Sequence, residues 1–170
     1  RISGLDVADG GIDKDALVSR KGILIDFCEM WGSIDQGVTT RKAVEYCSTG
    51  EPVELMYDCI GVGAGVKTES NRLKSENLLP KDMKFHPWAA SAKVQDPEGH
   101  IIRGDKQSPK NKDHYSNLKA QAWSIVGQRF FKTWQAVTKG IEIDPEEIIS
   151  LDSEMKNIHT LIKELSQATS

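Results

Sequence analysis

The 170-residue sequence has no apolar run near the roughly 20 residues that cross a bilayer, because charged residues interrupt every hydrophobic stretch within a few positions. We therefore expect no membrane among its partners. The sequence also lacks a starting methionine and a basic-then-apolar leader with a cleavage site. We expect it to be a fragment of a longer polypeptide that contains a further domain.

Cysteine is scarce. Cys28, Cys47 and Cys59 form an odd set without CxxC spacing, and the four histidines lie far from them in the sequence. This pattern disfavours both a disulfide framework and a structural zinc site, which needs Cys or His ligands at short spacing. Each cysteine stands in a segment typical of a buried strand or helix, so we expect reduced core thiols.

The net charge of −3 conceals an uneven distribution. Residues 59–140 hold 14 lysines and arginines against 7 acids, a net +7, which leaves −10 for the rest of the chain. A basic middle beside an acidic beginning is typical of a phosphate-binding surface next to a cluster of cation-binding carboxylates. Solvated charge on helix faces explains the same numbers equally well.

The first third of the chain predicts an α/β fold. Short β-branched and apolar segments indicate strands at 2–7, 16–19 and 23–31, and the Lys21-Gly22 turn favours a hairpin between the last two. Helical spacing follows at 39–47, with Thr39 or Thr40 as the N-cap, and then another strand at 53–58. A strand reached through a helical crossover usually pairs in parallel. The resulting order β-β-β-α-β is that of the ribonuclease H fold.

The remainder predicts further helices in the same single domain, residues 1–170. A helix to about residue 76 and a short strand at 83–86 precede a polar excursion at 89–111 that turns at 96–99. Residues 113–137 are helical, with core residues expected at Trp123, Val126, Phe130, Trp134 and Val137. A last helix is expected to start at Asp144-Pro145, with a narrow apolar seam at Leu151, Met155, Ile158, Ile162 and Leu165.

Two aspartates are the candidate catalytic residues. Asp6 ends the first strand and Asp58 ends the first strand after the crossover helix, so a parallel pairing brings both carboxylates to one sheet edge. Like charges that close repel each other unless a cation lies between them. Oxygen ligands without nearby His or Cys favour Mg²⁺ or Mn²⁺, and two ions suit phosphodiester hydrolysis. Asp9 is a further candidate ligand and Asp13 a weaker one, although Asp6 and Asp9 could instead be turn residues that cap their own backbone.

Three glycines, Gly61, Gly63 and Gly65, directly follow Asp58. Their GxGxG pattern is not the GxGxxG of dinucleotide-binding domains, and no GxxxxGK[ST] loop occurs in the sequence. A nucleotide-binding α/β domain is therefore a weak alternative. Small residues that let a DNA backbone or a metal-bound phosphate approach a helix N-terminus fit the pattern better.

Three segments stand out as motifs. They are Gly-Leu-Asp-Val-Ala-Asp-Gly-Gly at 4–11, Tyr-Asp-Cys-Ile-Gly-Val-Gly-Ala-Gly-Val at 57–66, and Asn-Leu-Lys-Ala-Gln-Ala at 117–122 with Arg129-Phe130. These motifs resemble those of the nuclease domains of large terminase subunits of tailed bacteriophages. The segments 144–152 and Glu164-Leu165 are similar to the region that follows in that family. The most specific piece is Asp-x-x-Gly-Val-Gly-Ala-Gly, and the similarity spans nearly the whole chain.

The resemblance implies a ribonuclease-H-like domain that cuts concatemeric double-stranded viral DNA during packaging with two Mg²⁺ or Mn²⁺ ions, Asp6 and Asp58 being the catalytic acids. It implies a transient motor on the procapsid in the host cytoplasm, absent from the mature virion, with an ATPase domain of the same polypeptide, a small terminase subunit and a portal protein as partners. The third acid of the family lies in a Ser-Pro-x-x-Ala-Asp-Ala motif that this sequence lacks. Asp105, Asp113 and Asp152 are poor substitutes, since their contexts do not match.

If the chain is a nuclease, basic residues of its middle part should hold the duplex by its phosphates without reading bases. The candidates are Lys67, Arg72, Lys74, Lys106, Lys110, Lys112 and Lys119. The missing third acid leaves open a second hypothesis, a non-catalytic module that clamps DNA and docks within the packaging motor.

Overall fold

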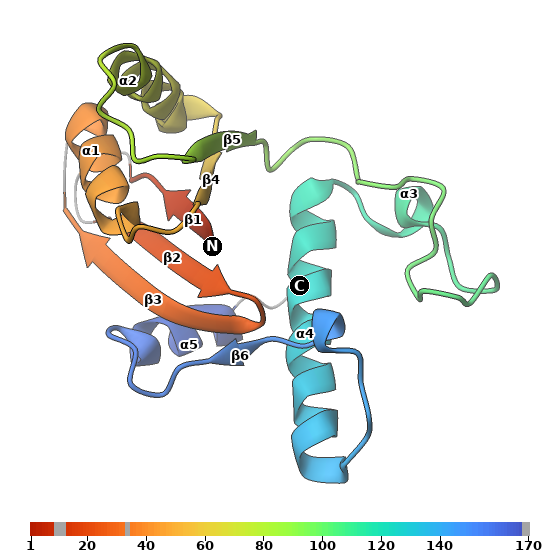
Figure 1. The fold of residues 1–170 in the computed structure, drawn as a ribbon. Helices are drawn as coiled ribbons and strands as arrows, with labels where there is room; N and C mark the ends of the chain where they lie inside the picture. The colour runs from red at the N-terminus through yellow and green to blue at the C-terminus, as the bar shows by residue number, and fades with distance from the viewer. Residues whose placement is uncertain (9–12, 33–34, 168–170) are drawn as a thin grey trace. The chain divides into compact units, whose positions relative to one another are not determined.

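The computed structural model describes residues 1–8, 13–32 and 35–167 (Figure 1). The chain divides into two compact units. Unit 1 comprises Arg1–Trp88 together with the chain from Ser150 onward, and unit 2 comprises Ala89–Ile149. That all 170 residues form one domain remains a prediction.

A six-stranded mixed sheet forms the centre of unit 1, in the order β5-β4-β1-β2-β3-β6. Its strands are β1 (Ile2–Asp6), β2 (Asp15–Lys21), β3 (Leu24–Trp31), β4 (Glu54–Asp58), β5 (Lys84–Trp88) and β6 (Ser150–Leu151). The first three strands form an antiparallel meander, and β4 lies parallel to β1. Both the predicted meander and the predicted parallel crossover strand are confirmed.

Two helices, α1 (Gln36–Cys47) and α2 (Ala64–Ser75), pack together against one face of this sheet (Figure 1). The core lies between them and the sheet, where Leu5, Leu17 and Leu55 alternate with residues of the other face. The prediction that Thr39 or Thr40 caps α1 is wrong, because both are buried inside the helix. Asp35 is the N-cap, and its carboxylate accepts a hydrogen bond of 3.0 Å from the Val38 amide.

The helix α5 (Ile158–Gln167) belongs to the opposite side of the sheet. Its Thr160 and Glu164 line a groove together with Ala16 of β2, a residue that alternates with the core-facing Leu17. Asn157 anchors its start, because its side-chain amide donates to the Cys28 carbonyl at 3.0 Å.

The prediction of a last helix that starts at Asp144 is wrong in its extent. Asp144 does cap a helical turn, but only the 3₁₀ turn η2 (Pro145–Glu147) forms there. The chain then pairs with β3 as β6, with the Ser150 amide donating to the Ile23 carbonyl at 2.8 Å. Sheet hydrogen bonds therefore override the local helix signal, and α5 begins 14 residues after the predicted N-cap.

Unit 2 contains the short helix α3 (Asn111–His114) and the long helix α4 (Leu118–Lys139). Two buried amides organise the predicted excursion before them. The Asn111 side chain donates to the Asp96 carbonyl at 2.8 Å, and Gln121 bonds both backbone groups of Gln95. The predicted turn at 96–99 is confirmed by a 3.0 Å bond from the Gly99 amide to the Asp96 carbonyl.

The expectation that the apolar residues of α4 form a core is wrong for three of the five. Trp123, Trp134 and Val137 are 42%, 47% and 79% exposed, while Val126 and Phe130 are half-buried. The only fully buried side chain of α4 is the polar Gln121. Periodicity revealed the helix correctly, but a unit this small offers few apolar side chains against which a long helix can pack.

Candidate active site

Asp6 and Asp58 end two neighbouring parallel strands, β1 and β4. The strand register pairs Leu5 with Tyr57, one residue before each aspartate. Leu5 and Tyr57 are buried in the core, so alternation along the strands directs both aspartates to the opposite face. Neighbouring strands lie about 4.8 Å apart, so both aspartates leave the carboxyl end of the sheet from adjacent strands on the same face. Their catalytic role remains a prediction.

The backbone after Asp58 turns sharply and makes close contacts that require glycine. The Asp58 carboxylate accepts a 3.0 Å hydrogen bond from the Ile60 amide. A Cβ on Gly63 would lie 1.6 Å from the Asp58 carbonyl oxygen, and one on Gly65 would lie 1.8 Å from the side-chain oxygen of Gln36. Close packing of the strand end and of α1 therefore accounts for these two glycines without any nucleotide.

Asp6 lies in a groove of about 710 Å³ between the sheet edge and α5. Asp13, the weaker ligand candidate, and Glu164 of α5 also line this groove, whereas Asp58 does not. In the sequence, Glu164 belongs to the family resemblance at 164–165, but the amphipathic pattern of α5 indicates no role for it in this groove. Among the described residues that line the groove, Asp6, Asp13 and Glu164 carry carboxylates and Lys14 is the one cation.

Metal ligation by the described residues is incomplete. Asp9, the third predicted ligand, lies outside the described residues. Within 1–8, 13–32 and 35–167, no three His, Cys, Asp or Glu side chains come together as a metal-binding group. Asp6 and Asp58 therefore need at least one further ligand to hold an ion.

Asp15 is a buried carboxylate that sequence reasoning missed. It is fully buried in β2 and is hydrogen-bonded through both oxygens. One oxygen accepts from the Ala8 amide at 3.0 Å, and the other accepts from the Thr39 hydroxyl at 2.6 Å. Because Ala8 follows Asp6 by two residues, Asp15 ties the chain that leaves β1 to α1. Asp15 is the first residue of β2 and follows Asp13 and Lys14, so the sequence carried no clear signal of its burial.

The three aspartates considered for the place of the third catalytic acid have local roles. Asp105 accepts from the Gln107 amide at 2.8 Å and Asp152 accepts from the Glu154 amide at 2.9 Å, so both cap turns. Asp113 stands in the first turn of α3, where a carboxylate stabilises the helix dipole. Local backbone contacts explain all three residues.

The predicted DNA-binding residues divide between the two units. Lys67, Arg72 and Lys74 lie on α2, whereas Lys106, Lys110, Lys112 and Lys119 belong to unit 2. Lys110 and Lys112 both pair with Glu98, and their hydrogen bonds lower the pKa of that carboxyl to about 2. DNA binding by these residues remains a prediction.

The cysteines follow the prediction of core thiols in part. Cys28 and Cys47 are buried, and burial raises the pKa of each thiol. Cys59 is half-buried. Protonated thiols of this kind are poor nucleophiles and poor metal ligands.

Comparison with known proteins shows the fold. No protein-family model matches the chain, and no curated protein matches it. Among solved structures, the nuclease domain of the large terminase subunit gp2 of bacterial virus Sf6 aligns at 22% identity with a TM-score of 0.75. A mutant gp2c of the large terminase subunit from bacteriophage Sf6 with calcium aligns at 23% identity with a TM-score of 0.79. A mutant nuclease domain of the Sf6 subunit with manganese aligns at 22% identity with a TM-score of 0.72.

Each alignment covers 97% of this chain and 68% of the other. At this identity the similarity establishes the three-dimensional arrangement. The chain therefore has the fold of these terminase nuclease domains, a ribonuclease-H-like mixed α/β sheet flanked by helices.

Proposed function

We propose that this chain is the nuclease domain of a large terminase subunit and cuts double-stranded DNA during genome packaging. The observation that carries the proposal is that Asp6 and Asp58 end two neighbouring parallel strands in matched register. Two carboxylates on neighbouring strands repel each other, and this repulsion favours a bound cation. The fold similarity to terminase nuclease domains supports the same proposal.

The donor set fits a hard divalent ion, because Asp6 and Asp58 offer only carboxylate oxygens. Solved structures of the same fold contain manganese or calcium. Mg²⁺ or Mn²⁺ bound there would supply Lewis acidity toward the phosphate and its attacking water. Asp9 and carboxylates from elsewhere in the full polypeptide are the candidates for the remaining ligands.

The chain's own residues would orient the reaction. Asp15 holds the segment after Asp6 against α1, and the Ile60 amide fixes one oxygen of Asp58. Each carboxylate thus leaves its strand in a defined direction, and pre-oriented ligands reduce the reorganisation that accompanies reaction. The partners remain the ATPase domain of the same polypeptide, the small subunit and the portal protein, on a procapsid in the host cytoplasm. In the described residues no helix is long and apolar enough to cross a membrane.

Asp58→Asn should reduce nicking of supercoiled plasmid in Mn²⁺ by about 100-fold or more, as loss of a main electrostatic group in an active site does. Asn retains the oxygen that accepts from the Ile60 amide, so the melting temperature should change little. Asp82→Asn is the matched control, because Asp82 is exposed with a φ of 62°, a conformation that Asn tolerates. Nicking by Asp58→Asn at the unmodified rate would exclude the proposal.

The second candidate function is a DNA clamp that does not cut by itself. The observation that favours it is that no three His, Cys, Asp or Glu side chains of the described residues come together as a metal-binding group. DNA binding without nicking by this chain, with nicking restored when the chain is extended by several tens of residues, would assign the missing ligand to the longer polypeptide. A nucleotide-binding domain loses support, because packing explains Gly63 and Gly65.

A further inference from the structure

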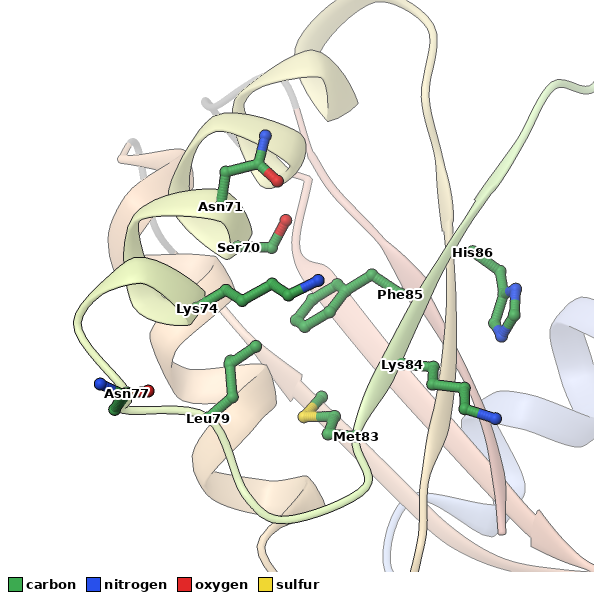
Figure 2. A pocket seen from close by; sticks show the side chains of 9 residues that line it. All are labelled: Ser70, Asn71, Lys74, Asn77, Leu79, Met83, Lys84, Phe85 and His86. Atoms are coloured by element: carbon green, nitrogen blue, oxygen red, sulfur yellow. The ribbon is translucent and has the colours of Figure 1, made fainter.

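A second groove, of about 590 Å³, borders the edge strand β5 (Figure 2). Its polar side chains come from α2 with the turn after it and from β5: Ser70, Asn71, Lys74, Asn77, Lys84 and His86. No acidic side chain is among the described residues that line it, although the chain has 25 aspartates and glutamates. A lining rich in hydrogen-bond donors and free of carboxylates favours an anion.

The two faces of α2 differ in how their charges are used. Arg72 belongs to the face toward α1, where Glu69 binds both Arg72 and Arg41 at 2.6 Å. Lys74 instead extends toward β5 and lines the groove together with Phe85 (Figure 2). Lys74 and Lys84 form none of the ion pairs within the described part of the chain, so their charge is available to a ligand.

Glu54 is an acid beside the groove on the sheet side. It stands opposite Lys84 in the strand register, and its carboxylate lies 3.5 Å from His86 Nε2. It offsets part of the positive charge on that side of β5. Lys74, on the other side of the strand, therefore contributes the larger share of the attraction for an anion.

The backbone of β5 adds a donor between the two lysines. The Lys84 amide donates inward to the Val53 carbonyl, and the Trp88 carbonyl accepts inward from the Cys59 amide, each at 2.9 Å. Alternation along a parallel strand then directs the Phe85 amide outward, at the edge. Pro87, the next outward residue, has no amide hydrogen and so limits pairing with an added strand. The edge therefore suits a phosphate chain better than a peptide strand.

We propose that this groove grips the sugar-phosphate backbone of the DNA substrate at a distance from the cut, an inference that rests on the proposed function. Trp88 pairs with Asp58, and Lys84 lies four residues earlier on the same strand. At about 3.3 Å per residue the two ends of β5 are roughly 13 Å apart. Lys84 shares a sheet face with Asp58, whereas Lys74 reaches β5 from the α2 face, so this distance applies to Lys84. A duplex rises about 3.4 Å per base pair, and a phosphate at Lys84 is therefore about four base pairs from the scissile bond.

The test measures binding of a short fluorescent duplex in EDTA, without metal, as a function of salt concentration. Each lost phosphate contact lowers the slope of log affinity against log salt by about 0.9, so Lys74→Gln/Lys84→Gln should lower it by about 2. DNA should also protect both lysines from acetylation. Lys21→Gln is the matched control, because Lys21 is exposed, ends β2 and pairs with Glu51 away from the groove.

Arg41→Gln tests the assignment to one face of α2. It removes a positive charge that pairs with Glu69 on the α1 side of that helix, so its salt slope should equal that of the unmodified chain even if its melting temperature falls. An unchanged slope for the double variant, or protection of Lys74 and Lys84 by inorganic phosphate but not by the duplex, would overturn the groove as a DNA site.

Plasmid nicking in Mn²⁺ is measured in parallel and separates the two proposals. A reduced slope in a chain whose Asp58→Asn variant nicks normally would refute the proposed function and leave the groove supported. If the double variant leaves the slope unchanged while Asp58→Asn abolishes nicking, the groove proposal is refuted and the proposed function is supported.

Discussion

At the scale of single residues, the arrangement around Asp6 depends on a carboxylate that itself is far from solvent. Asp15 lies on the core face of the sheet and connects the Ala8 amide with the Thr39 hydroxyl. Burying a carboxylate is costly unless its oxygens are hydrogen-bonded. Its position in β2 is therefore explained by what it holds, the chain immediately after Asp6.

Asp15→Ala should lower the free energy of unfolding by about 2–4 kcal/mol, since it leaves a buried amide and a buried hydroxyl without their acceptor. It should also raise the Mn²⁺ concentration that gives half-maximal nicking. Asp15→Asn should change the free energy of unfolding and the Mn²⁺ requirement much less, because its side-chain oxygen can accept from the Ala8 amide while its side-chain amide donates to the Thr39 hydroxyl. Denaturant unfolding and metal titration measure the two effects.

Ser19→Ala provides the control for this residue. It removes another buried hydrogen bond of β2, the 2.7 Å contact with Ser3, which is remote from the Asp6 loop. It should cost stability without changing the metal requirement. Equal metal requirements for Asp15→Ala and Ser19→Ala would reduce Asp15 to a purely structural residue.

The sequence contained enough information to place Asp6 and Asp58 at the ends of neighbouring parallel strands, because strand ends and a crossover helix are local signals. It placed Glu164 in the family resemblance but not in the groove at Asp6, because that position depends on how α5 packs. It did not separate Arg72 from Lys74 either. Those two residues differ by the neighbour that each helix face meets, which is a property of the tertiary structure.

At the scale of secondary-structure elements, most strands and helices formed where hydrophobic periodicity indicated them. The exception is the segment after Asp144, where the turn signal was correct and the helix did not continue. The two residues of β6 have little strand propensity of their own, and their pairing with Leu24 and Ile25 decides their conformation. Such non-local hydrogen bonds leave no periodic trace in the sequence.

The contact between α1 and α2 depends on an ionised Glu69. Hydrogen bonds from Arg72, then Arg41, lower its pKa from 4.5 to about 2. A carboxyl with a lowered folded-state pKa stabilises the fold above its unfolded pKa, and this contribution disappears as the pH falls from about 4.5 to about 2. Glu69→Gln should therefore lower the free energy of unfolding at pH 7, with the difference from the unmodified chain vanishing near pH 2.

Unfolding in urea at several pH values measures this dependence. Glu76→Gln is a suitable comparison, because Glu76 also pairs with Arg72 but its side chain is 43% exposed, against 12% for Glu69. Exposed pairs contribute little, so its effect should be smaller. A pH-independent difference for Glu69→Gln would show that packing, rather than the ion pair, joins the helices.

At the scale of the whole molecule, the chain leaves unit 1 after Trp88 and returns to it at Ser150. The returning segment adds β6 to the edge of β3 and supplies α5, whose Glu164 lines the groove at Asp6. The sheet is therefore complete only when both ends of the sequence have folded together. Neither end predicts this, because their pairing spans more than 100 residues.

Ending the chain at Ile149 should consequently damage unit 1 rather than only shorten it. The truncation removes Met155, which is 6% exposed and whose burial is worth about 2 kcal/mol, and it also removes the Asn157 bond to the Cys28 carbonyl. For a chain of this size about 2–4 °C corresponds to each kcal/mol, so the melting temperature should fall by roughly 5 °C or more. The newly exposed edge of β3 should also promote association between chains, visible by size-exclusion chromatography.

A chain that ends at Gln167 keeps β6 and α5 and should behave as the unmodified protein. Equal melting temperatures for the two truncations would mean that the returning segment contributes nothing to the sheet on which Asp6 and Asp58 stand.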